Sequence, residues 1–275
     1  MQLTAIDQYL RTERLPHIWC SGCGIGIVMR ALIQAISESD LSLDRIGIVS
    51  GIGCSGRVAG YVKLDSFHTT HGRAIPFATG LKLGNPYLKV IVVSGDGDLF
   101  TIGGNHFIHA ARRNMDLTVV CVNNFIYGMT GGQVGSTTPT DARTSTTPYG
   151  NFEPPFNLPH LAVACGAVYV ARWTVYHAVQ LITALREAIA RRGFSFVEVI
   201  SPCPTVYGAR NEMATGLAQM KYFKQNSERA RDGDVSEAGI ELGGKIKVGK
   251  FLDRERATFL DRVIRPEKEA APEVG

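Results

Sequence analysis

The chain has 275 residues, 45% of them hydrophobic, with 30 glycines and six cysteines. This length can bury a full core in one large or two small domains, and the glycine content suits an α/β protein with many tight turns. The formal net charge of +4 is too mild to indicate a nucleic-acid-binding stripe or a membrane-binding patch.

Nothing in the sequence indicates a membrane span or a secretory signal. The longest apolar run, 161–171, is interrupted by Arg172 before it reaches the ~20 residues that cross a bilayer. Residues 1–7 lack the basic segment and apolar core of a signal peptide. We therefore expect a cytoplasmic protein, in which cysteines are more often thiols or metal ligands than disulfides.

Four of the six cysteines lie in loops beside predicted elements. They are Cys20 and Cys23 before the helical pattern 25–36, Cys54 after the predicted strand 45–49, and Cys203 after the predicted strand 194–200. Loops beyond the strand ends of a parallel sheet gather at one edge, so these thiols can meet there. Zinc and an iron-sulfur cluster both accept four cysteines, but structural zinc usually takes two close pairs, so the scattered ligands favour the cluster.

The other two cysteines lie inside apolar runs. Cys121 belongs to 119–122 and Cys165 to 161–167. A cysteine in such a setting usually behaves as a small buried hydrophobic residue. We expect no metal at either position.

Polar residues follow two apolar runs in the middle of the chain. The β-branched run 89–94 predicts a buried parallel strand and ends at Gly-Asp-Gly, 95–97. The run 117–122 predicts a second strand and ends at Asn-Asn, 123–124. The glycines let a phosphate approach the backbone, while carboxylate and amide oxygens are ligands that Mg²⁺ prefers. A turn with a coincidental Asn pair is the alternative, and the spacing after two strands argues against it.

Helical patterns separate the predicted strands. They cover 25–36, 74–83, 104–113 and 175–190, and the last follows the 3.6-residue period most closely. This alternation predicts the fold class, an α/β doubly wound parallel sheet. The stretch 135–159, rich in Ser, Thr, Pro and Gly, predicts a long ordered loop near the site, with disorder as the alternative.

The sequence changes character near residue 226. We divide the chain into a main domain, 1–225, and an extension, 226–275, which we expect to contact a partner subunit. In the extension, 240–248 suggests a hairpin and 251–264 a short helical piece. The charged end, 265–275, suits a disordered terminus.

Taken together, the motifs resemble the beta subunit of the 2-oxoacid:ferredoxin oxidoreductases. The likeness runs from residue 19 to about 208, in the family's order. It is carried by Trp19-Cys-Ser-Gly-Cys-Gly24, Gly53-Cys-Ser55, His68-Thr-Thr-His-Gly-Arg-Ala74, Gly95-Asp-Gly-Asp98, Asn123-Asn-Phe-Ile-Tyr-Gly-Met-Thr-Gly-Gly-Gln133 and Thr147-Pro-Tyr-Gly150. It implies the diphosphate-binding fold of the thiamine diphosphate enzymes, with thiamine diphosphate, Mg²⁺ and one 4Fe-4S cluster as cofactors.

The resemblance also implies roles for individual residues. The contacts to thiamine diphosphate would be Ile52, Gly53, Cys54, Ser55, His71, Gly95, Gly97, Asp98, Met129 and Thr130. The Mg²⁺ ligands would be the side chains of Asp96 and Asn124 and the backbone oxygen of Ile126. The cluster ligands would be Cys20, Cys23, Cys54 and Cys203, which favours the cluster over zinc.

Physical chemistry bears on three of these contacts. Ser55 and Thr130 are short hydroxyl donors in glycine-rich loops, which suits phosphate oxygens. His71 has two interpretations, since it could donate to the diphosphate or cap the following helix.

In this family a 2-oxoacid is oxidatively decarboxylated, electrons pass through the cluster to a ferredoxin, and coenzyme A takes the acyl group; the reverse carboxylation uses the same parts. We expect no catalytic side chain here, because the activating glutamate belongs to a second domain for which this chain has no room. That domain would lie on an alpha subunit, in a dimer of heterodimers. Met129, where pyruvate-type members typically have Asn, favours 2-oxoglutarate.

Three other functions stay open from the sequence. The first is a pyruvate or broad-specificity 2-oxoacid oxidoreductase. The second is a thiamine diphosphate decarboxylase or carboligase without redox chemistry, whose cysteines hold structural zinc. The third is a non-catalytic binding module in which the cysteines scaffold the fold.

Overall fold

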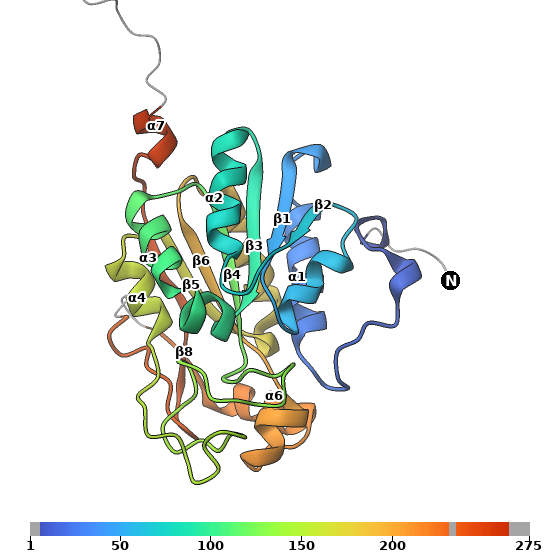
Figure 1. Ribbon diagram of the computed structural model, residues 1–275, viewed down its shortest axis with the longest axis vertical. Helices are drawn as coiled ribbons and strands as arrows, with labels where there is room; N and C mark the ends of the chain where they lie inside the picture. Colours follow the sequence, from blue (N-terminus) through green and yellow to red (C-terminus); the bar gives the residue numbers. More distant parts are fainter. Residues whose placement is uncertain (1–5, 231–234, 264–275) are drawn as a thin grey trace, which may run out of the picture.

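The computed structural model describes residues 6–230 and 235–263. Its centre is an eight-stranded sheet in the order β2-β1-β3-β4-β6-β5-β8-β7 (Figure 1). The strands are β1 (Ile46–Ser50), β2 (Asp65–His68), β3 (Lys89–Gly95), β4 (Thr118–Asn123), β5 (Tyr169–Thr174), β6 (Ser195–Ile200), β7 (Ser227–Arg229) and β8 (Ile246–Asp253). The first six strands pair in parallel, and β8 pairs antiparallel with β5.

Helices cover both faces of this sheet. They are α1 (Ile25–Ser37), α2 (Ala74–Gly84), α3 (Gly104–Arg113), α4 (Leu158–Ala164), α5 (Ala178–Ala190), α6 (Gly216–Asn226) and α7 (Phe259–Val263). One hydrophobic cluster contains the buried residues of α1 and α5, and a second contains those of α2, α3 and α4 (Figure 1). The predicted doubly wound α/β fold is confirmed.

The central strands are apolar because they are covered on both faces. Every residue of β4 and all but the two ends of β3 are buried, as expected of parallel strands between helical layers. The predicted bounds of these strands agree with the structure to within one residue. No helix within the described residues is long and apolar enough to cross a membrane.

The prediction missed β5. Its apolar run ends at Arg172 in the sequence, yet Arg172 lies inside the strand with no exposed surface. Its Nε donates to Glu198 Oε2 on β6 at 2.6 Å, and its Nη1 donates to the Ala238 carbonyl at 2.7 Å. A buried ion pair therefore links β5 and β6, and a hydrogen bond ties both to the segment before β8.

Two predictions for the extension are wrong. Residues 240–248 do not form a hairpin, because β8 pairs with β5 and β7 instead. The helical piece predicted at 251–264 is shorter, since β8 runs to Asp253 and only α7 is helical. The partner of β8 is distant in sequence, so local patterns could not identify it. The division at residue 226 stays a prediction, and residues 265–275 lie outside the described ones.

Candidate functional site

A cavity of about 90 Å³ opens among the loops that follow β1, β3 and β4, at the carboxyl edge of the sheet. Its walls are Ile52, Gly53, Cys54, Ser55, His71, Gly95, Asp96, Gly97, Asp98, Asn124, Ile126, Tyr127, Gly128, Met129 and Thr130. All the residues predicted to contact thiamine diphosphate or Mg²⁺ are among them. The structure brings these residues together, and their ligands stay a prediction.

Asp98 organises the loops around the cavity. It is only 2% exposed, and its Oδ1 accepts hydrogen bonds from the Ile52 and Gly72 N–H groups at 3.1 and 2.8 Å. Its Oδ2 accepts from Ser94 Oγ at 2.6 Å. With both oxygens occupied by protein donors, the carboxylate fixes two loops against β3.

His71 lies beside Asp98 and does not cap the following helix. Its Nδ1 is 2.5 Å from Asp98 Oδ1, without the alignment of a hydrogen bond. The first turn of α2 has no side-chain cap. The capping interpretation of His71 is therefore wrong, and the ring stands at the mouth of the cavity.

Asp96 has the environment of a cation ligand. Burial raises its carboxyl pKa to about 6, although a hydrogen bond from Thr137 and the N–H groups of Gly97 and Asn124 lower that pKa in part. A desolvated carboxylate is compensated well by a divalent cation. The amide oxygen of Asn124 and the carbonyl oxygen of Ile126 would complete an all-oxygen set, which suits Mg²⁺.

Two side chains that sequence reasoning left without roles shape the loop after β4. Tyr127 donates from its hydroxyl to the Gly97 carbonyl at 3.2 Å, and a methyl group on Gly97 would lie 2.4 Å from the Tyr127 ring. Gln133 accepts from Thr130 Oγ1 at 2.6 Å and donates to the Thr130 carbonyl at 2.9 Å. In the sequence, the only signal for these two roles is the position of Tyr127 and Gln133 within the motif after β4.

A buried network supports the loop that carries Asn124. The Asn123 amide donates to Glu198 Oε1 at 2.7 Å, and its Oδ1 accepts from the Phe125 N–H at 3.0 Å. Phe125 has φ of 67°, a left-handed conformation that costs a non-glycine residue about 1–2 kcal/mol. The Arg172–Glu198 pair below Asn123 thus helps to hold an unfavourable turn in place.

Replacing Arg172 with Met is expected to destabilise the chain by about 3–5 kcal/mol, because the Glu198 charge is then buried without its partner. The double variant Arg172→Met/Glu198→Gln removes that charge and is expected to regain part of the loss. Urea unfolding with the cysteines kept reduced measures both. Equal losses in the single and double variants would contradict the account.

The four candidate cluster ligands lie near one another, and Cys54 also lines the cavity. A methyl group on Gly128 would lie 3.7 Å from both Cys54 Sγ and Cys203 Sγ, so these sulfurs are at most twice that distance apart. Burial, together with the nearby charges of Cys203, Cys54 and Cys20, raises the thiol pKa of Cys23 to about 12. The four thiols are therefore neighbours, and Gly128 leaves space beside two of them.

Zinc and an iron-sulfur cluster require different spacings of these thiols. All six cysteines are free thiols, and no group of three or more His, Cys, Asp or Glu among the described residues could hold a metal ion as placed. Tetrahedral zinc with Zn–S bonds of 2.3 Å draws thiolates to within about 4 Å of each other. A cluster has irons and sulfides between its ligands and needs wider spacing. The upper limit on the distance between Cys54 Sγ and Cys203 Sγ admits either metal, so the cluster stays a prediction.

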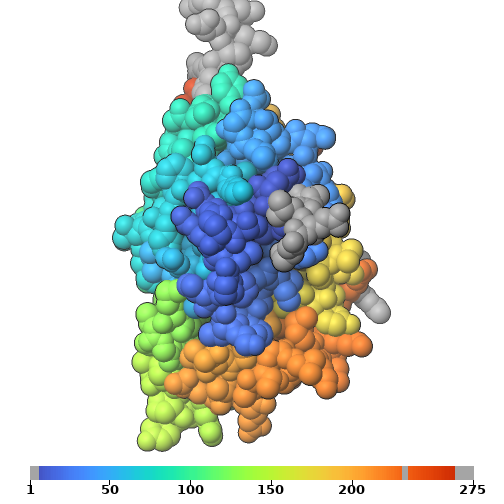
Figure 2. Space-filling model, turned by 90° about the vertical axis from the view of Figure 1, so that its right-hand side faces the viewer, coloured from blue at the N-terminus to red at the C-terminus, as the bar shows by residue number. Residues whose placement is uncertain are grey.

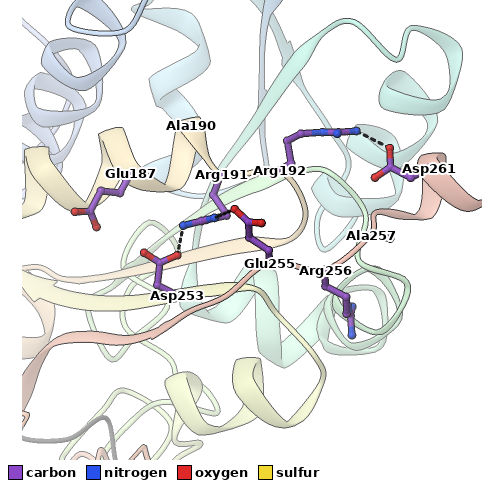
Figure 3. Close-up of a pocket in the computed structure, with 9 residues that line it drawn as sticks. All are labelled: Glu187, Ala190, Arg191, Arg192, Asp253, Glu255, Arg256, Ala257 and Asp261. Atoms are coloured by element: carbon purple, nitrogen blue, oxygen red, sulfur yellow. Dashed lines mark hydrogen bonds and ion pairs between the residues drawn. The ribbon is translucent and has the colours of Figure 1, made fainter.

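A larger hollow of about 870 Å³ lies between the end of α5 and the residues after β8 (Figure 3). Its arginines already have protein partners: Arg191 pairs with Asp253, Arg192 pairs with Asp261, and Arg256 donates to the Ala111 carbonyl. It contains no predicted site residue. The smaller cavity is therefore the candidate site.

Comparisons with known proteins show what the whole chain is similar to. Residues 51–199 match the model of the thiamine pyrophosphate enzyme, C-terminal TPP binding domain. The chain is 52% identical to the 2-oxoglutarate synthase subunit KorB of Methanothermobacter thermautotrophicus, over 93% of this chain and 89% of that protein. It is equally identical to the KorB subunit of Methanocaldococcus jannaschii, over 93% of this chain and 94% of that protein.

A solved structure is also similar. It is the 2-oxoglutarate:ferredoxin oxidoreductase from Magnetococcus marinus with 2-oxoglutarate, coenzyme A and succinyl-CoA bound. The TM-score is 0.84 at 32% sequence identity, and the match covers 96% of this chain and 89% of that one.

Proposed function

Because the chain belongs to the KorB family, the beta subunits of 2-oxoacid:ferredoxin oxidoreductases, we propose that it binds thiamine diphosphate, Mg²⁺ and a 4Fe-4S cluster for the oxidative decarboxylation of 2-oxoglutarate. The products are succinyl-CoA and CO₂, and the electrons pass to a ferredoxin. The reverse carboxylation uses the same site. The chief support is one cavity lined by all the residues predicted to contact the diphosphate or Mg²⁺, and by Cys54 of the predicted cluster ligands.

The cavity is half of a cofactor site. Its volume of about 90 Å³ is well below the ~300–1,000 Å³ typical of small-molecule sites. No glutamate is among the residues that line it. An alpha subunit would cover the open side and supply the glutamate that activates the aminopyrimidine ring.

The chain's own residues would orient the cofactor. Asp96, Asn124 and the Ile126 carbonyl would hold Mg²⁺, while the Ser55 hydroxyl would donate to a diphosphate oxygen. The Thr130 hydroxyl, which donates to Gln133 Oε1 at 2.6 Å, would exchange that acceptor for a diphosphate oxygen. Asp98 holds the loops at Ile52 and Gly72 close to the end of β3 by accepting hydrogen bonds from both loops and from Ser94. When bound, thiamine diphosphate supplies the carbon nucleophile and the electron sink for decarboxylation.

Electron transfer to the cluster would need only a short step. Cys54 lines the cofactor cavity, and its sulfur lies beside Gly128, which also lines that cavity. Trp19 fixes this loop, because its Nε1 donates to the Cys54 carbonyl at 2.7 Å. One short loop thus borders both the cofactor and cluster positions.

The proposal predicts that turnover depends on a second chain. We expect the isolated, iron-replete chain to reduce no methyl viologen when it is supplied with Mg²⁺, thiamine diphosphate, 2-oxoglutarate and coenzyme A. The assembly with the alpha subunit is expected to reduce methyl viologen, with a higher kcat/KM for 2-oxoglutarate than for pyruvate. Turnover by the isolated chain would refute the claim that this chain holds only half of the cofactor site. A preference for pyruvate would refute the assignment of 2-oxoglutarate as the substrate.

A further inference from the structure

Among the four cluster cysteines, Cys20 alone is exposed, whereas Cys23, Cys54 and Cys203 are half-buried. Its loop rests on the start of α6, since a methyl group on Gly216 would lie 2.5 Å from the Gly22 carbonyl oxygen. Electron transfer weakens steeply with distance. A cluster held here would therefore exchange electrons with another protein most readily through the surface around Cys20.

Exposed apolar side chains lie on both sides of this loop. Ile18 is 59% exposed, and its backbone N–H is fixed by Tyr61 Oη at 2.9 Å. Leu217, 66% exposed, follows Gly216 in the first turn of α6. Exposed apolar groups on fixed backbone are typical of the centre of a protein contact.

Basic residues outnumber acidic ones in the chain segments that carry or adjoin these apolar groups. The segments 10–24, 54–63 and 203–224 contain seven Lys and Arg against two acids, a net charge of +5, compared with +4 for the whole chain. Lys221 and Lys224 follow Leu217 at helical spacings of four and seven, so all three share one exposed face of α6. Across the Cys20 loop, the Arg14 guanidinium is fixed by the Gly60 carbonyl at 2.9 Å.

These bases are available to a partner. Within residues 6–230 and 235–263, none of Arg14, Arg57, Lys63, Lys221 and Lys224 forms an ion pair. By contrast, the exposed Arg192 and Lys250 are paired with carboxylates. Unpaired charge of one sign around an apolar centre favours docking of a protein of opposite charge.

Figure 2 shows the N-terminal segment, in dark blue, next to the α6 region, in orange, on one face of the molecule. We propose that this face is the docking surface for an acidic one-electron carrier protein. The surface is centred on Cys20, with the apolar Ile18 and Leu217 and the basic Arg14, Lys221 and Lys224. The inference deepens the proposed function and rests on it, since it requires a cluster at the four cysteines.

The test is charge reversal in the assembled enzyme. The variant Arg14→Glu/Lys221→Glu/Lys224→Glu is assayed with an acidic ferredoxin and, separately, with methyl viologen, which needs no docking surface. We expect the KM for ferredoxin to rise about tenfold or more at low salt, and kcat with methyl viologen to stay within about twofold of the parent enzyme.

Arg113→Glu is the matched control, because Arg113 is exposed on α3 and forms no ion pair with another described residue. It is expected to leave both assays unchanged. An unchanged KM for ferredoxin in the triple variant would overturn the docking surface. Loss of assembly with the alpha subunit would also overturn it, by assigning this face to that subunit. Failure of the parent enzyme to reduce methyl viologen would instead overturn the proposed function.

Discussion

Replacing Asp96 with Asn is expected to weaken binding of Mg²⁺ and thiamine diphosphate by about 100-fold or more. Even residues that only support a metal ligand cost 10–100-fold in affinity when removed, and Asp96 is the one anionic ligand in the proposed set. Isothermal titration of the assembled enzyme with thiamine diphosphate at fixed Mg²⁺ measures the change. Binding within about threefold of the parent enzyme would contradict the assignment of Asp96.

The same substitution is expected to stabilise the chain when no Mg²⁺ is bound. Burial raises the folded-state pKa of Asp96 from 3.8 to about 6, so the folded state binds a proton more tightly than the unfolded state between about pH 4 and 6. The free energy of unfolding therefore falls as pH rises through that window and stays reduced above it. Asp96→Asn removes this penalty, on the order of 1–3 kcal/mol at pH 7.

Asp98 is the matched control, because it lies two residues away and is equally buried at 2% exposure. Its carboxylate already accepts three protein hydrogen bonds. Asp98→Asn is therefore expected to destabilise the metal-free chain by about 1–3 kcal/mol. Urea unfolding in the presence of a chelator compares the two variants, and a loss of stability in both would contradict the proposed role of Asp96.

Replacing Cys54 with Ser is expected to abolish the cluster and with it more than about 99% of ferredoxin reduction. A 4Fe-4S cluster takes four thiolates, and Cys54 is the ligand whose loop also borders the cofactor cavity. Iron and sulfide analysis after anaerobic purification is expected to fall from about four of each per chain to well below that. An unchanged iron content would remove Cys54 from the ligand set.

Two observations separate loss of the cluster from general damage. Cys165→Ser changes a half-buried thiol outside the cavity and is expected to keep its iron and activity. Cys54→Ser is expected to keep thiamine diphosphate affinity within about threefold, since the backbone of 52–55 remains. Loss of thiamine diphosphate binding in Cys54→Ser would mean that the loop, and not only the ligand, had been disrupted.

The grouping of the candidate site's residues could be predicted from sequence because its signals are local. Each half of the magnesium motif follows a β-branched strand, and parallel strands bring their ends to one edge. The structure accordingly places Asp96, Asn124 and Ile126 at one cavity. Local sequence also separates the cysteines into two groups, because four of them lie in predicted loops and the other two lie inside apolar runs.

Features that depend on distant partners could not be predicted. Arg172 seemed to end an apolar run, but it is buried because Glu198 on another strand neutralises it. The strand β8 pairs with β5, more than seventy residues earlier, and a local pattern suggested a hairpin instead. The roles of Tyr127 and Gln133 likewise arise from contacts that only the folded loop creates.

The most direct test of the central claim is an absorbance spectrum of the enzyme, purified without oxygen together with its alpha subunit, before and after addition of 2-oxoglutarate and coenzyme A. The account predicts about four irons per beta chain and a visible band that bleaches on substrate addition, because electrons from the substrate reduce the cluster. Zinc in place of iron, with no visible band, would contradict it and leave a thiamine diphosphate enzyme without redox chemistry.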